Sequence, residues 1–196
     1  TAVEFAKAPV ASVEQAESAI AAAEEAFPHW SGLPMAERQR LVAAIADALE
    51  NELEDMARLL TREQGKPLHE ARFEVDASVR ALRYCASQTL SGRSIPSDVS
   101  HIEVRRKPLG VVACIMPWNY PLLLAINKVA PGLVTGNCLI LKPAPTTPLA
   151  TLEFGRICRD ILPPGVLNVI ADDGGLGGFL TAHPDIAKIS LAGSKQ

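Results

Sequence analysis

The first half of the chain repeats apolar residues with the spacing of an α-helix. In the segment VEQAESAIAAAEEAF, residues 13–27, alanine and isoleucine return every three or four positions between polar residues. Ser12 precedes this segment and Gln15 stands three residues later, which is the spacing of a capping box. We therefore predict a helix that begins after Ser12 and ends at Phe27 and Pro28, because a proline interrupts the helical hydrogen bonds.

Two further helices are predicted in this half. Pro34 suits the first turn of a helix over residues 35–64, and Gly65 suits its end. Another helix follows over about residues 68–90. Each of these helices has a single apolar stripe, so we expect them to pack on another part of the protein.

The second half of the chain changes to the pattern of buried strands. Four runs are apolar on both faces and have the length of a strand, and segments of helical pattern separate them. This order predicts an α/β fold with a Rossmann-like open parallel sheet, β-α-β-α-β-α-β, covered by helices on both sides and joined by right-handed crossovers. The runs occupy residues 110–116, 136–142, 165–171 and 187–192, and the helices occupy residues 121–135, 148–162 and 174–182.

The stretch VSHIEVRRK, residues 99–107, alternates apolar and polar positions and predicts a half-exposed antiparallel strand. Its basic run, residues 105–107, is too short for a binding patch and is interpreted as a solvated strand end. The formal net charge of −3 gives no reason to expect nucleic acid or an anionic membrane as a partner. No run reaches the roughly 18 to 20 apolar residues that a membrane span needs.

The 4 cysteines are too far apart to form a Cys-x-x-Cys pair, so no metal site is expected. Cys114 and Cys138 lie inside apolar runs and are interpreted as small buried side chains. Reduced thiols of this kind favour a cytoplasmic location.

Chemistry is expected where the parallel strands end, because ligands of open α/β sheets bind beyond the carboxyl ends of the strands. Residues 117–121, 142–145, 171–175 and 193–194 follow the four runs and supply an amide, an ammonium, several glycines and a hydroxyl. That set suits a nucleotide, since glycines let the backbone approach a phosphate and Lys142 can donate to ribose or phosphate oxygens. Each feature alone is also typical of an ordinary turn or a solvated lysine, and no GxGxxG motif follows the first run.

The combination of motifs is more specific than its parts. The segments KPLGVVACIMPWNYPL, GNCLILKPAPTTPL, LPPGVLNVI and HPDIAKISLAGS stand in this order and at these separations. Together they closely resemble the NAD(P)-dependent aldehyde dehydrogenase superfamily, and the similarity runs from about residue 14 to the end. The resemblance covers the amino-terminal, cofactor-binding portion of that family.

The resemblance implies a role for several residues at the strand ends. Asn119 matches the asparagine whose side-chain amide helps form an oxyanion hole. Lys142 matches the lysine that hydrogen-bonds the adenosine ribose of NAD or NADP, and Ser194 matches the serine that contacts the pyrophosphate. The cofactor path is matched by Met116, Pro117 and Trp118, the glycine near the adenine by Gly177, and the residue before the pyrophosphate serine by Gly193.

Two departures from the family pattern bear on the cofactor. Pro145 stands where many NAD-preferring members carry a glutamate that grips the ribose hydroxyls, so the resemblance leaves the choice between NAD and NADP open. Leu191 and Ala192 replace the Phe-Thr of the usual Phe-Thr-Gly-Ser element, which removes a hydroxyl but keeps the Gly-Ser pair.

The family's nucleophilic cysteine and general-base glutamate lie downstream of the Gly-Ser element, and neither motif is present in this sequence. We therefore expect the 196 residues alone to be inactive. As part of a longer enzyme they would serve the NAD(P)-dependent oxidation of an aldehyde to a carboxylic acid through a cysteine thiohemiacetal. The alternatives are a non-catalytic nucleotide-binding or interaction fragment, and the front half of a coenzyme-A-acylating relative.

The resemblance also predicts the domain organisation. Residues 1–98 would form helices that pack on the cofactor domain, residues 99–108 an oligomerisation-ribbon strand, and residues 109–196 the Rossmann-like domain. The ribbon strand implies a homo-oligomer, a dimer or a tetramer. Its family partner is a strand from the chain end, so we expect its edge to lack a partner from the same chain.

Overall fold

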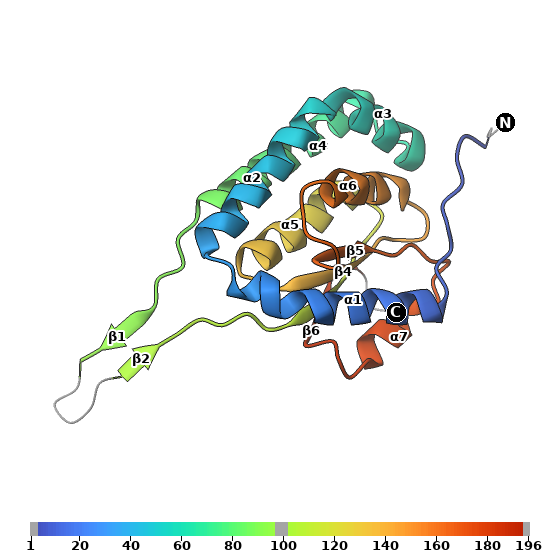
Figure 1. Ribbon diagram of the computed structural model, residues 1–196. Helices are drawn as coiled ribbons and strands as arrows, with labels where there is room; N and C mark the ends of the chain where they lie inside the picture. The colour runs from blue at the N-terminus through green and yellow to red at the C-terminus, as the bar shows by residue number, and fades with distance from the viewer. Residues whose placement is uncertain (1–3, 97–101, 194–196) are drawn as a thin grey trace.

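The computed structural model describes residues 4–96 and 102–193. They form seven helices and six strands, arranged in layers around a central sheet (Figure 1). The elements are α1 (Val13–Gly32), α2 (Met35–Asn51), α3 (Leu53–Gln64), α4 (Leu68–Ser87), β1 (Arg93–Ile95), β2 (Ile102–Val104), β3 (Val111–Ile115), α5 (Pro121–Val134), β4 (Cys138–Lys142), α6 (Leu149–Arg159), β5 (Leu167–Val169), α7 (Leu176–Ala182) and β6 (Lys188–Leu191).

The central sheet confirms the predicted α/β fold. Its four strands stand in the order β5-β4-β3-β6, and every neighbouring pair is parallel. Val112 of β3 is in register with Leu139 of β4 on one side and with Lys188 of β6 on the other. From β3 the chain adds β4 and then β5 on one side, and it then crosses to the other side of β3 to add β6. The order of the strands therefore reverses beside β3.

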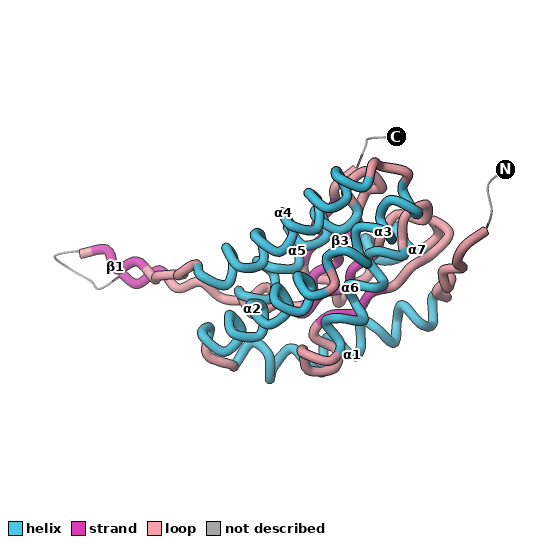
Figure 2. Tube along the Cα trace, turned by 90° about the horizontal axis from the view of Figure 1, so that it is seen from above, coloured by secondary structure: helices cyan, strands magenta, loops and turns pink. Residues whose placement is uncertain are grey.

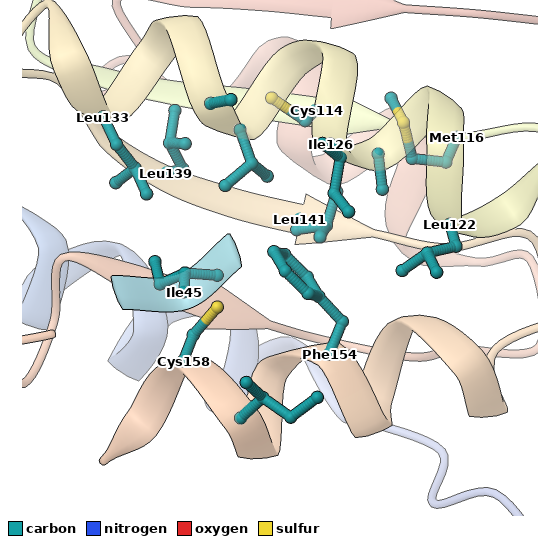
Figure 3. Close-up of a cluster of buried hydrophobic side chains, with 14 of the residues drawn as sticks. Ile45, Cys114, Met116, Leu122, Ile126, Leu133, Leu139, Leu141, Phe154 and Cys158 are labelled. Atoms are coloured by element: carbon teal, nitrogen blue, oxygen red, sulfur yellow. The ribbon is translucent and has the colours of Figure 1, made fainter. Parts of the chain in front are cut away.

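Helices cover both faces of the sheet. In Figure 1, α1 and α7 lie on one face and α5 and α6 on the other, with α2, α3 and α4 forming a further layer outside α5 and α6. The amino-terminal helices therefore pack on the rest of the chain through α5 and α6. Figure 3 shows the apolar contact that results: Phe154 of α6 points toward Leu141 of β4, and Ile126 of α5 also lies beside Leu141.

The helix signals in the sequence are confirmed at three positions and wrong at two. Ser12 and Gln15 form the predicted capping box, and Gly65 ends α3 in the left-handed conformation at φ 88°. The helix predicted to end at Pro28 continues to Gly32, because the fully buried side chain of Trp30 holds its last turn against the core. The single helix predicted over residues 35–64 is two helices that meet at Glu52.

The ribbon strand has a partner that the sequence did not predict. β2 pairs with β1 in an antiparallel hairpin, with Ser94 opposite Glu103. β2 thus has a partner from the same chain along one edge, and the expected absence of a partner from the chain end stays a prediction. Residues 99–101 of the predicted strand lie outside the described residues. The hairpin projects away from the helices in both views (Figures 1 and 2), and Ile102 and Val104 of β2 are exposed.

Candidate functional site at the carboxyl edge of the sheet

A hollow of about 820 Å³ lies where β3, β4 and β6 end. This is the edge at which open parallel sheets bind ligands. Every described residue that the family resemblance matched to the cofactor site or the oxyanion hole lines this hollow, and Ser194 lies outside the described residues. Those lining residues are Met116, Pro117, Trp118, Asn119, Lys142, Pro145, Gly177 and Gly193.

Backbone hydrogen bonds bring these strand ends together. The Met116 amide donates to the Lys142 carbonyl at 2.9 Å, and the Ala192 amide donates to the Ile115 carbonyl at 3.0 Å. Both bonds extend the ladder just past the last strand residues. The three loops therefore start from fixed points, and their side chains reach the same space.

Lys142, which lines the hollow, forms an ion pair that was not predicted from the sequence. Lys142 Nζ lies 2.5 Å from Asp172 Oδ1, and both side chains are almost fully buried. Asp172 Oδ2 accepts a hydrogen bond from the Leu176 amide at 2.7 Å, so the same carboxylate also holds the start of α7. The only available signal was the position of Asp172 at the end of the third apolar run.

The rest of the lining combines open space with flat apolar surface. A Cβ placed on Gly177 would have no heavy atom within 4 Å, so packing within the described chain does not require a glycine there. Trp118 and Leu191 are large apolar side chains left 60% and 61% exposed. Exposed apolar groups beside a buried cation suit a ligand with planar rings and polar or anionic substituents.

Asn119 lies in the loop between β3 and α5. Its backbone carbonyl accepts a hydrogen bond from Lys66 Nζ at 3.1 Å. Asn119 lines the hollow, and no hydrogen bond among the described residues uses its side-chain amide, so its two N–H donors can serve a ligand. An amide in that position can stabilise a negative charge that develops on a bound molecule.

Two carboxylates from the amino-terminal helices hold the starts of α5 and α6, which have no cap of their own. Glu74 of α4 accepts from the backbone amides of Leu122 and Leu123, and Glu63 of α3 accepts from those of Leu149 and Ala150. Burial raises the pKa of Glu63, although the two amide donors favour its charged form. These contacts could not be predicted from the sequence, because both glutamates lie on helices with ordinary polar faces.

None of the four cysteines lies in the hollow. Cys114 of β3 and Cys138 of β4 are buried in the sheet, where burial raises the pKa of each thiol to about 12. Burial also raises the pKa of Cys158 on α6 and of Cys85 on α4. The described residues thus place no activated thiolate at this edge.

A second hollow, of about 770 Å³, separates the hairpin from the helices. Two of its arginines have partners within the chain: Arg38 donates to backbone carbonyls, including that of Val134 at 3.0 Å, and Arg105 pairs with Glu103. Among residues 4–96 and 102–193, no cluster of His, Cys, Asp or Glu has the arrangement of a metal site. None of the helices in that same part of the chain is long and apolar enough to cross a membrane.

Comparison with known proteins gives relatives along nearly the whole chain. The chain is 40% identical over 202 residues to betaine aldehyde dehydrogenase 1 of Oryza sativa subsp. japonica, covering 96% of this chain and 40% of that protein. It is also 40% identical over 186 residues to aldehyde dehydrogenase LUC3 of a Fusarium species, covering 95% of this chain and 39% of that protein. The chain thus spans about two fifths of the length of these relatives.

Solved structures agree with the sequences. The glyceraldehyde-3-phosphate dehydrogenase of Methanocaldococcus jannaschii, complexed with NADP, superposes with a TM-score of 0.91 at 32% identity, over 94% of this chain and 42% of that chain. A variant of Staphylococcus aureus betaine aldehyde dehydrogenase in complex with NAD+ gives a TM-score of 0.87 at 35% identity, over 91% of this chain and 38% of that chain.

The sequence as a whole also matches one family model. That model, described as the aldehyde dehydrogenase family, covers residues 1–196. The match agrees with the order of the strand-end motifs and with the convergence of their residues on one edge of the sheet. The chain belongs to the aldehyde dehydrogenase family.

Proposed function

We propose that the carboxyl edge of the sheet binds NAD or NADP and that the chain is the cofactor-binding part of an enzyme that oxidises an aldehyde to a carboxylic acid. The observation that carries this proposal is the convergence of Asn119, Lys142 and Gly177 on one hollow at the ends of β3 and β4 and beside α7. Relatives of similar fold are complexed with NADP or NAD+.

The residues present fit a dinucleotide. The open space over Gly177 and the exposed Trp118 offer room and apolar surface for planar rings. Lys142 supplies a cation next to that surface. Among the described residues that line the hollow, it is the one that carries a charge. We assign Lys142 to the adenosine ribose and Gly193 with Ser194 to the pyrophosphate, as the family resemblance implies.

In the reaction a cysteine thiolate adds to the aldehyde carbonyl, and the carbonyl oxygen becomes an oxyanion. The Asn119 amide would donate a hydrogen bond to that oxygen, which stabilises the tetrahedral state more than the aldehyde. Bound NAD(P)+ supplies the hydride acceptor, and water activated by a carboxylate then releases the acid from the thioester. The thiolate must come from a residue other than the four cysteines of this chain, because three of them are buried and Cys85, on α4, does not line the hollow.

The same reasoning predicts that these 196 residues produce no NAD(P)H from aldehydes by themselves. An assay of the purified chain checks this. Turnover that is lost when one of the four cysteines is replaced would contradict it. The two alternatives, an inactive nucleotide-binding fragment and an acylating relative, can be distinguished by the coding sequence after codon 196. A cysteine motif there would favour an active enzyme over the inactive fragment, and the rest of that sequence would distinguish the acylating relative.

Asn119→Ala in the complete protein tests the proposed role. Removing one oxyanion donor should lower kcat by about 10²- to 10³-fold. The dissociation constant for the cofactor should stay within about twofold, because Asn119 acts on the reacting oxygen. Comparable losses in kcat and in cofactor binding would argue against the oxyanion role.

We also propose a homo-oligomer assembled through the β1–β2 hairpin, whose exposed Ile102 and Val104 project away from the helices. The three parts over residues 1–98, 99–108 and 109–196 remain our proposal for the domain organisation. A cytoplasmic location suits the four free thiols, although one relative is named as peroxisomal.

A further inference from the structure

A buried ion pair lies behind the loop that carries Asn119. It joins Lys66, in the connection between α3 and α4, to Glu74 of α4. The two side chains are 9% and 0% exposed. Burying two charges is costly, so a pair in this position needs good geometry and further hydrogen bonds.

Those further contacts go to the loop between β3 and α5 and to the first turn of α5. Lys66 Nζ donates to the Asn119 backbone carbonyl at 3.1 Å and lies 4.2 Å from the centre of the Tyr120 ring. Glu74 Oε1 accepts from the backbone amides of Leu122 at 3.0 Å and Leu123 at 3.1 Å. The pair thus makes hydrogen bonds to the backbone before Pro121, through Lys66, and after it, through Glu74.

We infer that Lys66 and Glu74 are positioning residues that fix the backbone of Asn119 and thereby aim its side-chain amide into the hollow. This inference rests on the oxyanion role proposed above. Asn119 is itself exposed, so packing around its side chain does not determine its direction. Its direction then depends on the backbone, which the Lys66 contact to the Asn119 carbonyl and the Glu74 contacts to the first turn of α5 hold in place.

The local sequence holds Lys66 in place. Gly65 ends α3 with φ 88°, a conformation that favours glycine, and Pro67 precedes the first turn of α4. The connection between the two helices is therefore short and stiff. Glu74 lies in the second turn of α4, on the face that packs against α5.

The test is a double-mutant cycle in the complete protein, with Lys66→Met and Asn119→Ala alone and combined. Lys66→Met should lower kcat by about 10- to 100-fold, the effect expected when a catalytic group is displaced by about 1 Å. The cofactor dissociation constant should stay within about twofold. In the Asn119→Ala background, Lys66→Met should lower kcat by less than about threefold, because there is no amide left to position.

Lys66→Met leaves Glu74 without a counter-charge and could unfold the protein. The variant K66M/E74Q removes both charges and keeps an acceptor for the amides of Leu122 and Leu123. It should show the same kcat loss, together with faster amide hydrogen exchange in a peptide covering residues 117–124. Arg72→Met is the matched control, because Arg72 pairs with Glu54 at 2.7 Å on the outer helices and does not touch the loop. It should change neither readout.

The outcomes separate the two proposals. Additive losses in the cycle, with a normal large effect of Asn119→Ala alone, would overturn the positioning role and leave the oxyanion role intact. A negligible effect of Asn119→Ala alone would overturn both. Unchanged exchange over residues 117–124 in K66M/E74Q would show that the pair does not hold the loop and would also overturn the inference.

Discussion

The Lys142–Asp172 ion pair predicts how the protein chooses between NAD and NADP. The ammonium proposed to face the ribose is already neutralised by a carboxylate 2.5 Å away. A 2′-phosphate would therefore find no free cation in the described lining and would lie near a buried negative charge. We expect wild-type protein to prefer NAD, although Pro145 does not supply the carboxylate that many NAD-preferring relatives carry.

Asp172→Asn releases that ammonium while keeping an oxygen that can accept from the Leu176 amide. A hydrogen bond to a charged group is worth roughly 1.5 to 3 kcal/mol. Since about 1.4 kcal/mol is a factor of ten in affinity, NADP binding should tighten by about 10- to 100-fold. NAD carries no 2′-phosphate, so its affinity should change by less than about threefold.

Isothermal titration with NAD+ and NADP+ at one ionic strength measures both constants. Asp173→Asn is the control, because Asp173 is the adjacent residue, carries the same charge and is exposed to solvent. Solvent screens its charge, so the ratio of the two dissociation constants should change little. If Asp172→Asn alters that ratio no more than Asp173→Asn does, the proposed function of the ion pair is wrong.

Three further predictions follow from the same structure. Pro145→Glu should shift cofactor preference toward NAD, and an unchanged ratio of NADP to NAD affinity would place residue 145 away from the ribose. At pH 8 only Cys85 should react readily with iodoacetamide, because the other three thiols are buried. A thiol whose pKa is about 12, as for Cys114 and Cys138, is roughly one part in 10⁴ thiolate at that pH. Rapid labelling of all four cysteines in folded protein would contradict this. Burial raises the pKa of Glu63 above its ordinary value of about 4.3, so its ionisation opposes folding as the pH rises from about 4.3 through that raised value. The Tm of Glu63→Gln minus that of wild type should therefore increase between pH 4 and pH 7, and a decrease would show that the amide donors outweigh burial.

The sheet and most of the site could be predicted because they depend on local order. An apolar run of strand length predicts a buried parallel strand, and parallel strands bring their carboxyl ends to one edge whatever their side chains are. Asn119, Lys142 and Gly193 each stand within a few residues of such an end. Their convergence therefore follows from the topology alone.

The supporting contacts could not be predicted because they join distant segments. Lys66 is 53 residues from Asn119, and Glu74 is 48 residues from Leu122. On a helix with many charged positions, nothing marks one glutamate as buried until the layer above it is known. Trp30 illustrates the same limit, since only its buried position explains why α1 continues past Pro28.

The location of the cofactor is the most direct test of the proposed function. A crystal structure of the complete protein with NAD+ or NADP+ should show a ribose hydroxyl of the adenosine within about 3.2 Å of Lys142 Nζ and planar rings over the surface beside Gly177. Cofactor bound instead in the hollow between the hairpin and the helices, or bound without any contact to Lys142, would contradict the proposal.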